Sequence, residues 1–373
     1  MASKRKRTQT MSAARKTIRL PQTLHMHRGG ELKQVQLAYE SWGELNERGD
    51  NAVLIFTGLS PSAHVTSSPE DPSPGWWEEM VGPSRPIDTN RYYVICFNSL
   101  GSCFGSTGPD TCIPGTDQPY RLSFPVLTVE DIAQSAYMAL PCLGIWKLHS
   151  IVGPSMGGMS ALAFAMMFPG YSDNLVLISS APRATPFAIA LRSLQREIIR
   201  SDPDWHGGNY PLGEGPIMGM RLARKLGMIS YRSAGEWQQR FGRERIAEER
   251  KSGDPFCIDF EVESYLEAHA AKFTGQFDPN CYLYLSRAMD LFDAAEHGGS
   301  VAAGLGRVDV KRALVMGVET DFLFPLAQQR EIAEGLRRDD REVSFEALDS
   351  IQGHDSFLAD MDRFRPVIAD FFD

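Results

Sequence analysis

The sequence predicts an α/β fold in which helices cover both faces of a largely parallel sheet and a helical insertion interrupts the chain. Three observations lead to this prediction. Short apolar runs alternate with helical patterns before residue 183 and after residue 307, as in a parallel sheet with crossover helices. A serine flanked by glycines stands between one apolar run and a helix of small residues. Between 183 and 307 helical patterns dominate, with few strand-like runs.

Strands are expected at the short apolar runs. Residues 51–57 and 91–98 have the composition of strands that are buried on both faces. Residues 35–42 alternate before Gly43 and predict an early edge strand. The other strands are expected at the run that begins at Leu148 and at residues 174–180, 312–318 and 343–348.

Helices are expected between these strands. Thr128 begins a helix with Glu130 and Asp131 in its first turn, where acidic side chains favour the positive end of the helix dipole. This helix is expected to end near Gly144. Within the insertion, helical patterns cover residues 191–200, 221–226, 233–250, 260–273 and 280–293, and after it they cover residues 328–338 and a last segment from Ser356.

The domain organisation follows from the change of pattern after Pro182. The block from 183 to 307 is too long for a loop, so we expect a helical lid there and an α/β core made of residues 21–182 and 308–373. Residues 1–20 carry lysine and arginine but no acidic residue, and they predict a disordered basic tail. They lack the apolar stretch of a secretory signal; a nuclear or mitochondrial address is the less favoured alternative.

Composition narrows the classes of partner. A net charge of −9 over 373 residues argues against general nucleic-acid binding, which needs a basic surface. No apolar run reaches the length of about 18 residues that a membrane span requires, so no membrane partner is expected. The six cysteines lack C-x-x-C spacing, which favours reduced thiols in a cytoplasmic protein over a disulfide framework or a metal site.

The turn at Gly153, Ser155 and Gly157 is the strongest candidate for chemistry. It follows an apolar strand-like run and precedes a helix rich in alanine, leucine and methionine, which is the context of a G-x-S-x-G nucleophile elbow. The glycines are needed because the serine sits on a strained turn where a neighbouring Cβ would clash. We therefore expect Ser155 to be a nucleophile, and a plain structural turn is the alternative.

A serine nucleophile needs a histidine base and an acid that orients the base. His354 follows the strand expected at 343–348, and Asp321 follows the strand expected at 312–318. Glu319 competes with Asp321, which we prefer because it lies further beyond the strand and close to Pro325. The chain order serine, aspartate, histidine is that of the α/β-hydrolase fold, so this is the fold expected here.

Acyl chemistry also needs two backbone N–H groups that stabilise an oxyanion. One donor is expected from Met156, the residue after the nucleophile. The second is expected from the loop after an early strand, and Leu59 in the loop Gly58, Leu59, Ser60 and Pro61 is our choice. The alternative is that this loop only turns the chain.

Beyond these local patterns, the chain resembles the homoserine O-acetyltransferase family of α/β-hydrolase-fold acyltransferases. The resemblance extends from about residue 27 to residue 372. It rests on long motifs at residues 57–61, 75–83, 105–109, 153–159, 201–208 and 353–355. The resemblance implies transfer of an acyl group from acyl-CoA to a catalytic serine and then to the side-chain hydroxyl of an amino acid. It implies no cofactor other than acyl-CoA as co-substrate, and a homodimer formed through the helical insertion.

The same resemblance assigns further residues. Ser155, Asp321 and His354 match the family triad. Arg224 matches an arginine implied to bind the amino-acid carboxylate, and Asp355 matches an acid implied to contact the acceptor. A guanidinium fork suits a carboxylate, and a zwitterion needs one partner of each sign.

Two features resemble the serine O-succinyltransferase branch. Homoserine acetyltransferases typically read His-Ala-Leu-Ser-Gly where this chain has Gly58, Leu59, Ser60 and Pro61 after a threonine, and they lack an arginine at the position of Arg192. The loop is implied to select the amino acid and Arg192 the acyl-CoA. A cation in the acyl pocket would pair with the free carboxylate of a succinyl group.

The sequence thus predicts an amino-acid O-acyltransferase, with succinyl-CoA as the favoured donor and L-serine as acceptor, in sulfur amino-acid biosynthesis. A serine or homoserine O-acetyltransferase that uses acetyl-CoA is the nearest alternative. An esterase with the same triad and a binding protein on a degraded hydrolase scaffold are alternatives of other classes. The basic and acidic residues Arg224 and Asp355 argue against an esterase for neutral esters.

Overall fold

The computed structural model describes residues 12–251 and 253–373. Its centre is an eight-stranded sheet with the order β1-β4-β8-β5-β9-β10-β11-β12. Strands β5 to β12 of this sheet run parallel, while β1 and β4 form an antiparallel edge beside β8. The strands are β1 (Lys16–Arg19), β4 (Gln36–Trp42), β5 (Ala52–Phe56), β8 (Tyr93–Phe97), β9 (Leu148–Pro154), β10 (Ser172–Ile178), β11 (Arg312–Val318) and β12 (Glu342–Leu348).

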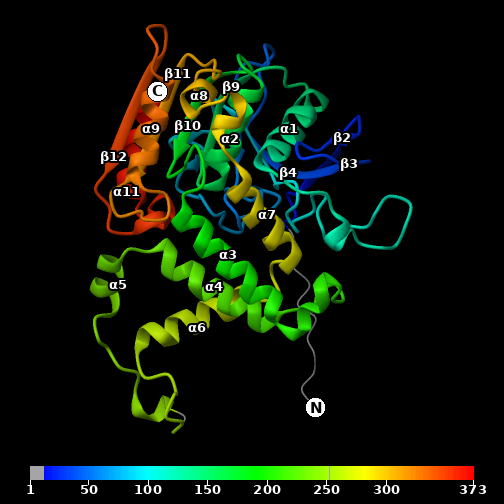
Figure 1. Ribbon diagram of the computed structural model, residues 1–373. Helices are drawn as coiled ribbons and strands as arrows, with labels where there is room; N and C mark the ends of the chain where they lie inside the picture. The colour runs from blue at the N-terminus through cyan, green and yellow to red at the C-terminus, as the bar shows by residue number, and fades with distance from the viewer. Residues whose placement is uncertain (1–11, 252) are drawn as a thin grey trace.

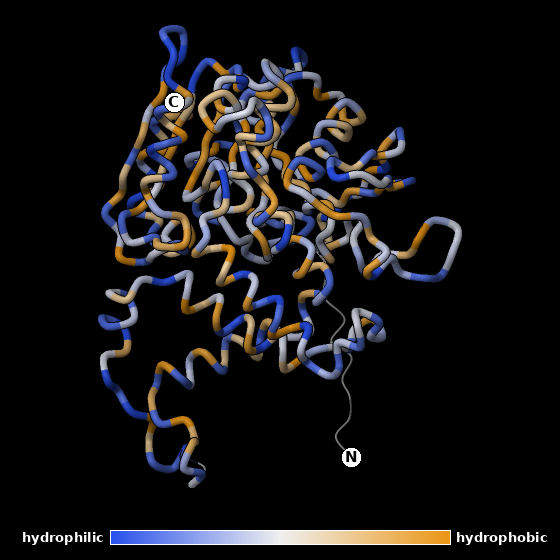
Figure 2. Tube along the Cα trace, viewed as in Figure 1, coloured by the Kyte–Doolittle hydropathy of each residue, from blue (hydrophilic) through white to orange (hydrophobic). Residues whose placement is uncertain are grey.

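Alternate residues of the central strands enter two separate apolar layers. On one face, Leu54 and Ile151 pack with helices α1 (Val129–Ala139), α2 (Met156–Met167) and α9 (Leu326–Leu336). On the other face, Val53 and Val152 pack with α11 (Met361–Phe372) and with the segment around Trp77. The period of two that is inherent in a strand therefore supplies both faces of the sheet from one apolar run. Figure 2 shows hydrophobic residues concentrated inside this body.

Helix α1 begins where its sequence signals predict. Thr128 accepts a hydrogen bond from the N–H of Asp131, and the Asp131 carboxylate accepts one from the N–H of Thr128, which is a capping box. The helix ends at Ala139, and the 3₁₀ turn η2 (Leu140–Leu143) carries the chain to Gly144, whose φ is +77°. This left-handed residue stops the helix and turns the chain into β9.

Between β10 and β11 the described residues form helices and no strand of the sheet. Figure 1 shows α3 to α6 as a separate layer below the sheet, with α7 leading back to the core. Helix α7 packs against α1, and α8 packs against α9. These helices are α3 (Pro186–Ser201), α4 (Ile217–Tyr231), α5 (Ala234–Phe241), α6 (Glu261–Phe273), α7 (Pro279–Leu291) and α8 (Val301–Leu305). The predicted α/β-hydrolase fold with a helical lid is confirmed.

The remaining elements are short. They are the strand pairs β2 (Leu24–His25) with β3 (Glu31–Leu32) and β6 (Val81–Gly82) with β7 (Ile87–Asp88), the helix α10 (Ser356–Ala359), and the 3₁₀ turns η1 (Arg121–Ser123), η3 (Pro203–Gly208), η4 (Glu248–Arg250), η5 (Ala294–His297) and η6 (Gly353–Asp355). No helix among the described residues is both long and apolar enough to cross a membrane.

Three expectations about local structure are wrong. Residues 16–19 of the predicted disordered tail form β1, because pairing with β4 satisfies their backbone groups; residues 1–11 lie outside the described part. As a result, β4 is not the edge strand of the sheet. The single helix expected at 233–250 ends at Phe241, because Gly242 adopts φ +50° and breaks the helical path.

Candidate active site

Ser155 lies on a strained turn between β9 and α2. Its φ and ψ are +56° and −125°, a combination that L-residues avoid. A Cβ on Gly153 would lie 2.1 Å from the carbonyl oxygen of Gly157, and one on Gly157 would lie 2.3 Å from that of Phe56. Both glycines are therefore required for α2 to pack so closely against the sheet while the serine hydroxyl projects from the turn.

Ser155, His354 and Asp321 form one hydrogen-bonded chain. The Oγ of Ser155 lies 2.7 Å from Nε2 of His354, and Oδ2 of Asp321 lies 2.7 Å from Nδ1 of the same imidazole. The second oxygen of Asp321 accepts hydrogen bonds from the backbone N–H groups of Leu323 and Phe324. The competing acid, Glu319, is exposed. The geometry is that of a base held by an acid against a hydroxyl nucleophile.

Aromatic rings hold the imidazole in place. Phe324 stacks on His354 with a centroid separation of 4.7 Å and an interplanar angle of 17°, and Phe357 meets it edge-on at 5.8 Å. Tyr231, at the end of lid helix α4, lies 6.1 Å from the same ring. These contacts restrict rotation of the histidine and exclude water from its faces. None of these aromatic residues was among the predicted site residues, because a single aromatic residue carries no local sequence signal of a catalytic neighbour.

Two backbone N–H groups are available beside Ser155. Within the described residues, neither Leu59 nor Met156 donates its N–H to a protein acceptor. Met156 is the first residue of α2, so its N–H lies at the positive end of the helix dipole. Leu59 lines the same cavity as Ser155. Their availability fits the predicted oxyanion role.

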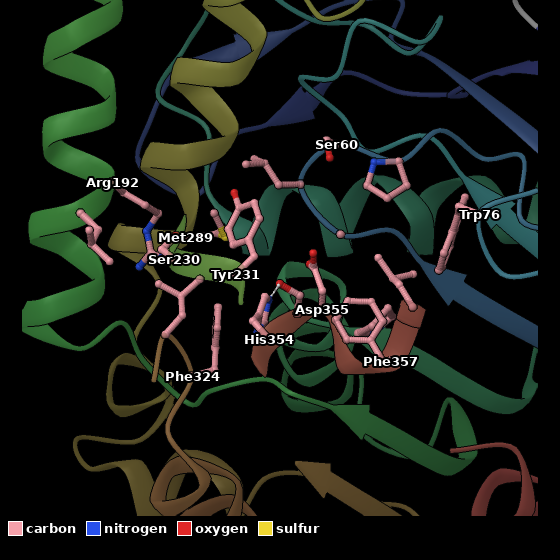
Figure 3. A pocket seen from close by; sticks show the side chains of 18 of the residues that line it. Ser60, Trp76, Arg192, Ser230, Tyr231, Met289, Phe324, His354, Asp355 and Phe357 are labelled. Atoms are coloured by element: carbon pink, nitrogen blue, oxygen red, sulfur yellow. Dashed lines mark hydrogen bonds between the residues drawn. The ribbon is translucent and has the colours of Figure 1, made fainter. Parts of the chain in front are cut away.

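Ser155 and His354 open into one cavity, part of which is open to solvent. The expected specificity loop lines it with Gly58, Leu59, Ser60 and Pro61, and so do Arg192 and Asp355. In Figure 3, Arg192 and Trp76 lie at opposite ends of the lining, with His354 between them. Core and lid both contribute walls, because the lid supplies Leu191, Arg192, Gln195, Ser230, Tyr231 and Met289.

Asp355 connects the catalytic loop to the lid. Its Oδ2 accepts a hydrogen bond from Nε of Arg232 at 3.2 Å, and Nη1 of Arg232 also donates to Gln352 at 2.5 Å. Burial raises the pKa of Asp355, while the positive charges of Arg232, His354 and Arg224 oppose that shift. Arg232 was not among the predicted site residues. Arg232 and Asp355 are 123 positions apart, so no local sequence pattern indicates that they pair.

Arg224 is absent from the residues that line the cavity. Its guanidinium carbon is 4.5 Å from the ring centroid of Phe273 and 6.0 Å from that of Tyr231, which is cation–π geometry. It makes no hydrogen bond or ion pair with any described residue. Its positive charge nevertheless acts to lower the pKa of Asp355 and of Tyr231, so Arg224 lies close enough to influence the site. Its role in binding the substrate carboxylate stays a prediction.

Arg192 reaches the cavity from α3. Its Nε donates to Oδ1 of Asp290 at 2.6 Å, and its Nη2 is buried without a hydrogen-bond partner among the described residues. A buried N–H without an acceptor is costly. Because Arg192 lines the cavity, its guanidinium is the cationic group there that suits an acceptor atom on a ligand.

The site's donor groups do not assemble a metal centre. Across residues 12–251 and 253–373, no group of three or more histidine, cysteine, aspartate or glutamate side chains is arranged to hold a metal ion.

Comparison with known proteins places this geometry in a family. A family model described as alpha/beta hydrolase fold matches residues 51–358. The chain is 60% identical over 362 residues to the serine O-succinyltransferase of Litchfieldella anticariensis, covering 97% of this chain and 99% of that protein. The chain belongs to the homoserine O-acetyltransferase family of α/β-hydrolase-fold acyltransferases.

Other similar proteins differ in their named activities. The L-serine/homoserine O-acetyltransferase of Streptomyces lavendulae is 55% identical over 362 residues, with 96% of this chain and 97% of that protein covered. The crystal structure of homoserine O-acetyltransferase from Bacillus anthracis superposes with a TM-score of 0.87 at 26% identity, with 96% and 97% coverage. Esterase E22 superposes with a TM-score of 0.86 at 26% identity, with 96% and 99% coverage.

Proposed function

We propose that the protein transfers an acyl group from acyl-CoA, preferably succinyl-CoA, to the hydroxyl of L-serine through an acyl-Ser155 intermediate. The observation that carries this proposal is the cavity, in which the hydrogen-bonded Ser155 and His354 share walls with Arg192 and Asp355. Relatives named as serine O-succinyltransferases support the choice of donor and acceptor. The product would serve sulfur amino-acid biosynthesis.

In the first half-reaction, Ser155 attacks the thioester carbonyl. His354 takes the hydroxyl proton through Nε2, and Asp321 stabilises the resulting imidazolium from the Nδ1 side. The N–H groups of Leu59 and Met156 stabilise the oxyanion. The carbon–sulfur bond then breaks, His354 returns the proton to the sulfur, and CoA leaves as a thiol while the acyl group stays on Ser155.

In the second half-reaction, L-serine replaces CoA. His354 takes the proton of the serine hydroxyl, whose oxygen attacks the acyl-Ser155 ester, and the proton then returns to Ser155 Oγ. Asp355 is assigned to the substrate ammonium, and its position in the cavity lining beside His354 supports this role. Arg224 is assigned to the substrate carboxylate; its guanidinium lies over the rings of Phe273 and Tyr231 and has no ion-pair partner among the described residues.

The competing function is ester hydrolysis, in which water takes the place of L-serine. The fold supports it equally, since esterase E22 has a nearly identical TM-score. The cavity favours transfer, because an esterase for neutral esters gains nothing from Arg192 and Asp355 in its lining. If the protein is an acyltransferase, the alternative donor is acetyl-CoA and the alternative acceptor is L-homoserine. The name of one relative, L-serine/homoserine O-acetyltransferase, supports both alternatives.

We also propose a cytoplasmic homodimer. All six cysteines are unbridged, which suits a reducing compartment. The lid carries exposed apolar side chains on α3 and α4, namely Leu194, Ile217, Met218, Leu222 and Ile229. An apolar surface of this kind suits a subunit interface.

The test is a matrix of acetyl-CoA and succinyl-CoA against L-serine and L-homoserine, with release of free thiol as the readout. The proposal predicts the largest kcat/KM for succinyl-CoA with L-serine. Repeating the matrix with Arg192→Ala should lower succinyl-CoA use by about tenfold or more, the size of a lost charge-assisted hydrogen bond. Undiminished succinyl-CoA use would contradict the role of Arg192, and thiol release at the same rate without any amino acid would identify an esterase.

A further inference from the structure

A buried carboxylate joins two arginines of helix α3 at the back of the cavity. Asp290, on α7, has a side chain that is 1% exposed. Its Oδ1 accepts a hydrogen bond from Nε of Arg192 at 2.6 Å, and its Oδ2 lies 2.6 Å from Nη2 of Arg196. Arg196 also donates from Nη1 to the hydroxyl of Ser286 at 3.0 Å. One carboxylate therefore serves two guanidinium groups.

The two arginines face different spaces. Arg192 lines the cavity that contains Ser155. Arg196 is one turn further along α3 and lines a separate surface groove with Glu197, Arg200 and Arg287. Asp290 lies between the two arginines. Arg196, outside the cavity, therefore contacts the same carboxylate that binds Arg192 at the cavity.

The charges in this cluster do not cancel. Two guanidinium groups share one carboxylate, which leaves one positive charge in excess where Arg192 and Arg196 have side chains only 6% and 13% exposed. The neighbouring Tyr282 adds no negative charge, because burial raises its pKa well above its usual range. Tyr231 is likewise kept neutral by burial, and Arg224 adds positive charge near both rings.

We infer that Arg196 is a specificity-determining positioning residue for the acyl donor. By binding one oxygen of Asp290 from outside the cavity, it prevents Asp290 from neutralising Arg192. The guanidinium of Arg192, which lines the cavity, then keeps an uncompensated charge for an acyl group that ends in a carboxylate. This inference rests on the proposed function, because it assigns Arg192 to the acyl end of a dicarboxylic donor.

The net charge beside Arg192 depends on how many guanidinium groups share the carboxylate of Asp290. Without Arg196, Arg192 and Asp290 would form a neutral one-to-one pair, and an incoming carboxylate would also face the charge of Asp290. Buried charges interact strongly because water screens them little. An acetyl group has no charge, so loss of the excess positive charge would not weaken its binding.

The experiment compares Arg196→Met with the matched control Arg200→Met. Arg200 lies on the same helix and lines the same groove, and its side chain stacks over Trp205 without touching Asp290. The inference predicts that Arg196→Met lowers kcat/KM for succinyl-CoA by about fivefold or more through KM and leaves that for acetyl-CoA within about twofold. Arg200→Met should leave both unchanged. An equal loss with both donors would overturn the inference.

A double variant separates charge from packing. In Arg196→Met/Asp290→Asn, the amide oxygen can still accept the hydrogen bond from Arg192 Nε, but the negative charge is gone. The excess positive charge is restored, so succinyl-CoA use should recover toward that of the wild type. No recovery, with circular dichroism showing a folded protein, would assign Arg196 a packing role and overturn the inference.

Failure of the inference can be told apart from failure of the proposed function. If Arg192→Ala reduces succinyl-CoA use while Arg196→Met behaves like Arg200→Met, the donor assignment stands and the role of Arg196 is refuted. If Arg192→Ala changes nothing, the donor assignment fails, and the inference about Arg196 fails with it.

Discussion

The Nε of Arg232 donates a hydrogen bond to Oδ2 of Asp355 across 3.2 Å, which joins the C-terminal end of lid helix α4 to the residue after His354. The next lid residue, Ser233, donates from its hydroxyl to the carbonyl of Ile351. Gly353 packs so closely against this segment that a Cβ on it would lie 2.7 Å from the N–H nitrogen of Ser233. The lid therefore contacts the loop that carries the catalytic base.

Replacing Arg232 by methionine should impair the second half-reaction more than the first. Asp355 would lose its partner, and its raised pKa would rise further, so it would be a poorer counterion for the ammonium of L-serine. We expect kcat/KM for L-serine to fall by about tenfold, with a smaller change in the initial release of CoA. Rapid-quench measurement of both steps checks this. Lys225→Met, which removes a lid cation bound to Glu267, is the control and should alter neither step.

Replacing Gly157 by alanine should destabilise the fold. The added Cβ would lie 2.3 Å from the carbonyl oxygen of Phe56, so α2 would have to move away from β5. We expect the free energy of unfolding in urea to fall by about 1–3 kcal/mol. Gly235→Ala is the matched control, because its Cβ meets nothing closer than 3.6 Å in α5 and alanine favours a helix. Equal stability of the two variants would show that the turn tolerates a side chain.

The carboxyl of Asp110 should make stability depend on pH. Burial, together with the nearby charge of Asp278, raises the pKa of Asp110 to about 7, and its Oδ1 accepts a hydrogen bond from Sγ of Cys281 at 3.3 Å. Between its unfolded pKa and about 7, the folded chain keeps a proton that the unfolded chain releases. The stability that this proton provides is complete below the unfolded pKa and is lost as pH rises through about 7.

Asp110→Asn removes this titration. Its free energy of unfolding should therefore fall less steeply than that of the wild type between about pH 5 and pH 7, by at most about 1.4 kcal/mol per pH unit. Urea unfolding across this range measures the two slopes. Asp117→Asn removes an exposed carboxylate of the same segment and should keep the wild-type slope. Parallel curves for wild type and Asp110→Asn would refute the assignment.

Much of the fold was predictable because local patterns and the topology of parallel sheets agree. The expected strand at 312–318 coincides with β11, and the loops after β9, β11 and β12 bring Ser155, Asp321 and His354 together. Carboxyl ends of parallel strands meet at one edge of a sheet, so chain order was enough to nominate the three residues. The capping box of α1 was equally readable, because its donors and acceptors lie within three residues.

What could not be predicted depends on contacts between distant residues. Arg192 and Asp290 are separated by 98 positions and Arg232 and Asp355 by 123, so neither pair leaves a periodic signal. Strand β1 was mistaken for tail because the short run Lys16–Arg19 has mostly exposed side chains; only its pairing with β4 orders it. The position of Arg224 behind aromatic side chains likewise follows from the packing of α4 against α6.

The central claim is that Ser155 carries the acyl group between two substrates, and mass spectrometry of the digested protein tests it most directly. The protein is mixed with succinyl-CoA in the absence of amino acid, quenched, and digested, with Ser155→Ala as the control. We predict one succinyl group on the peptide that contains Ser155, one equivalent of released CoA, and loss of the label when L-serine is added. An unlabelled protein whose CoA release depends strictly on L-serine would contradict the account.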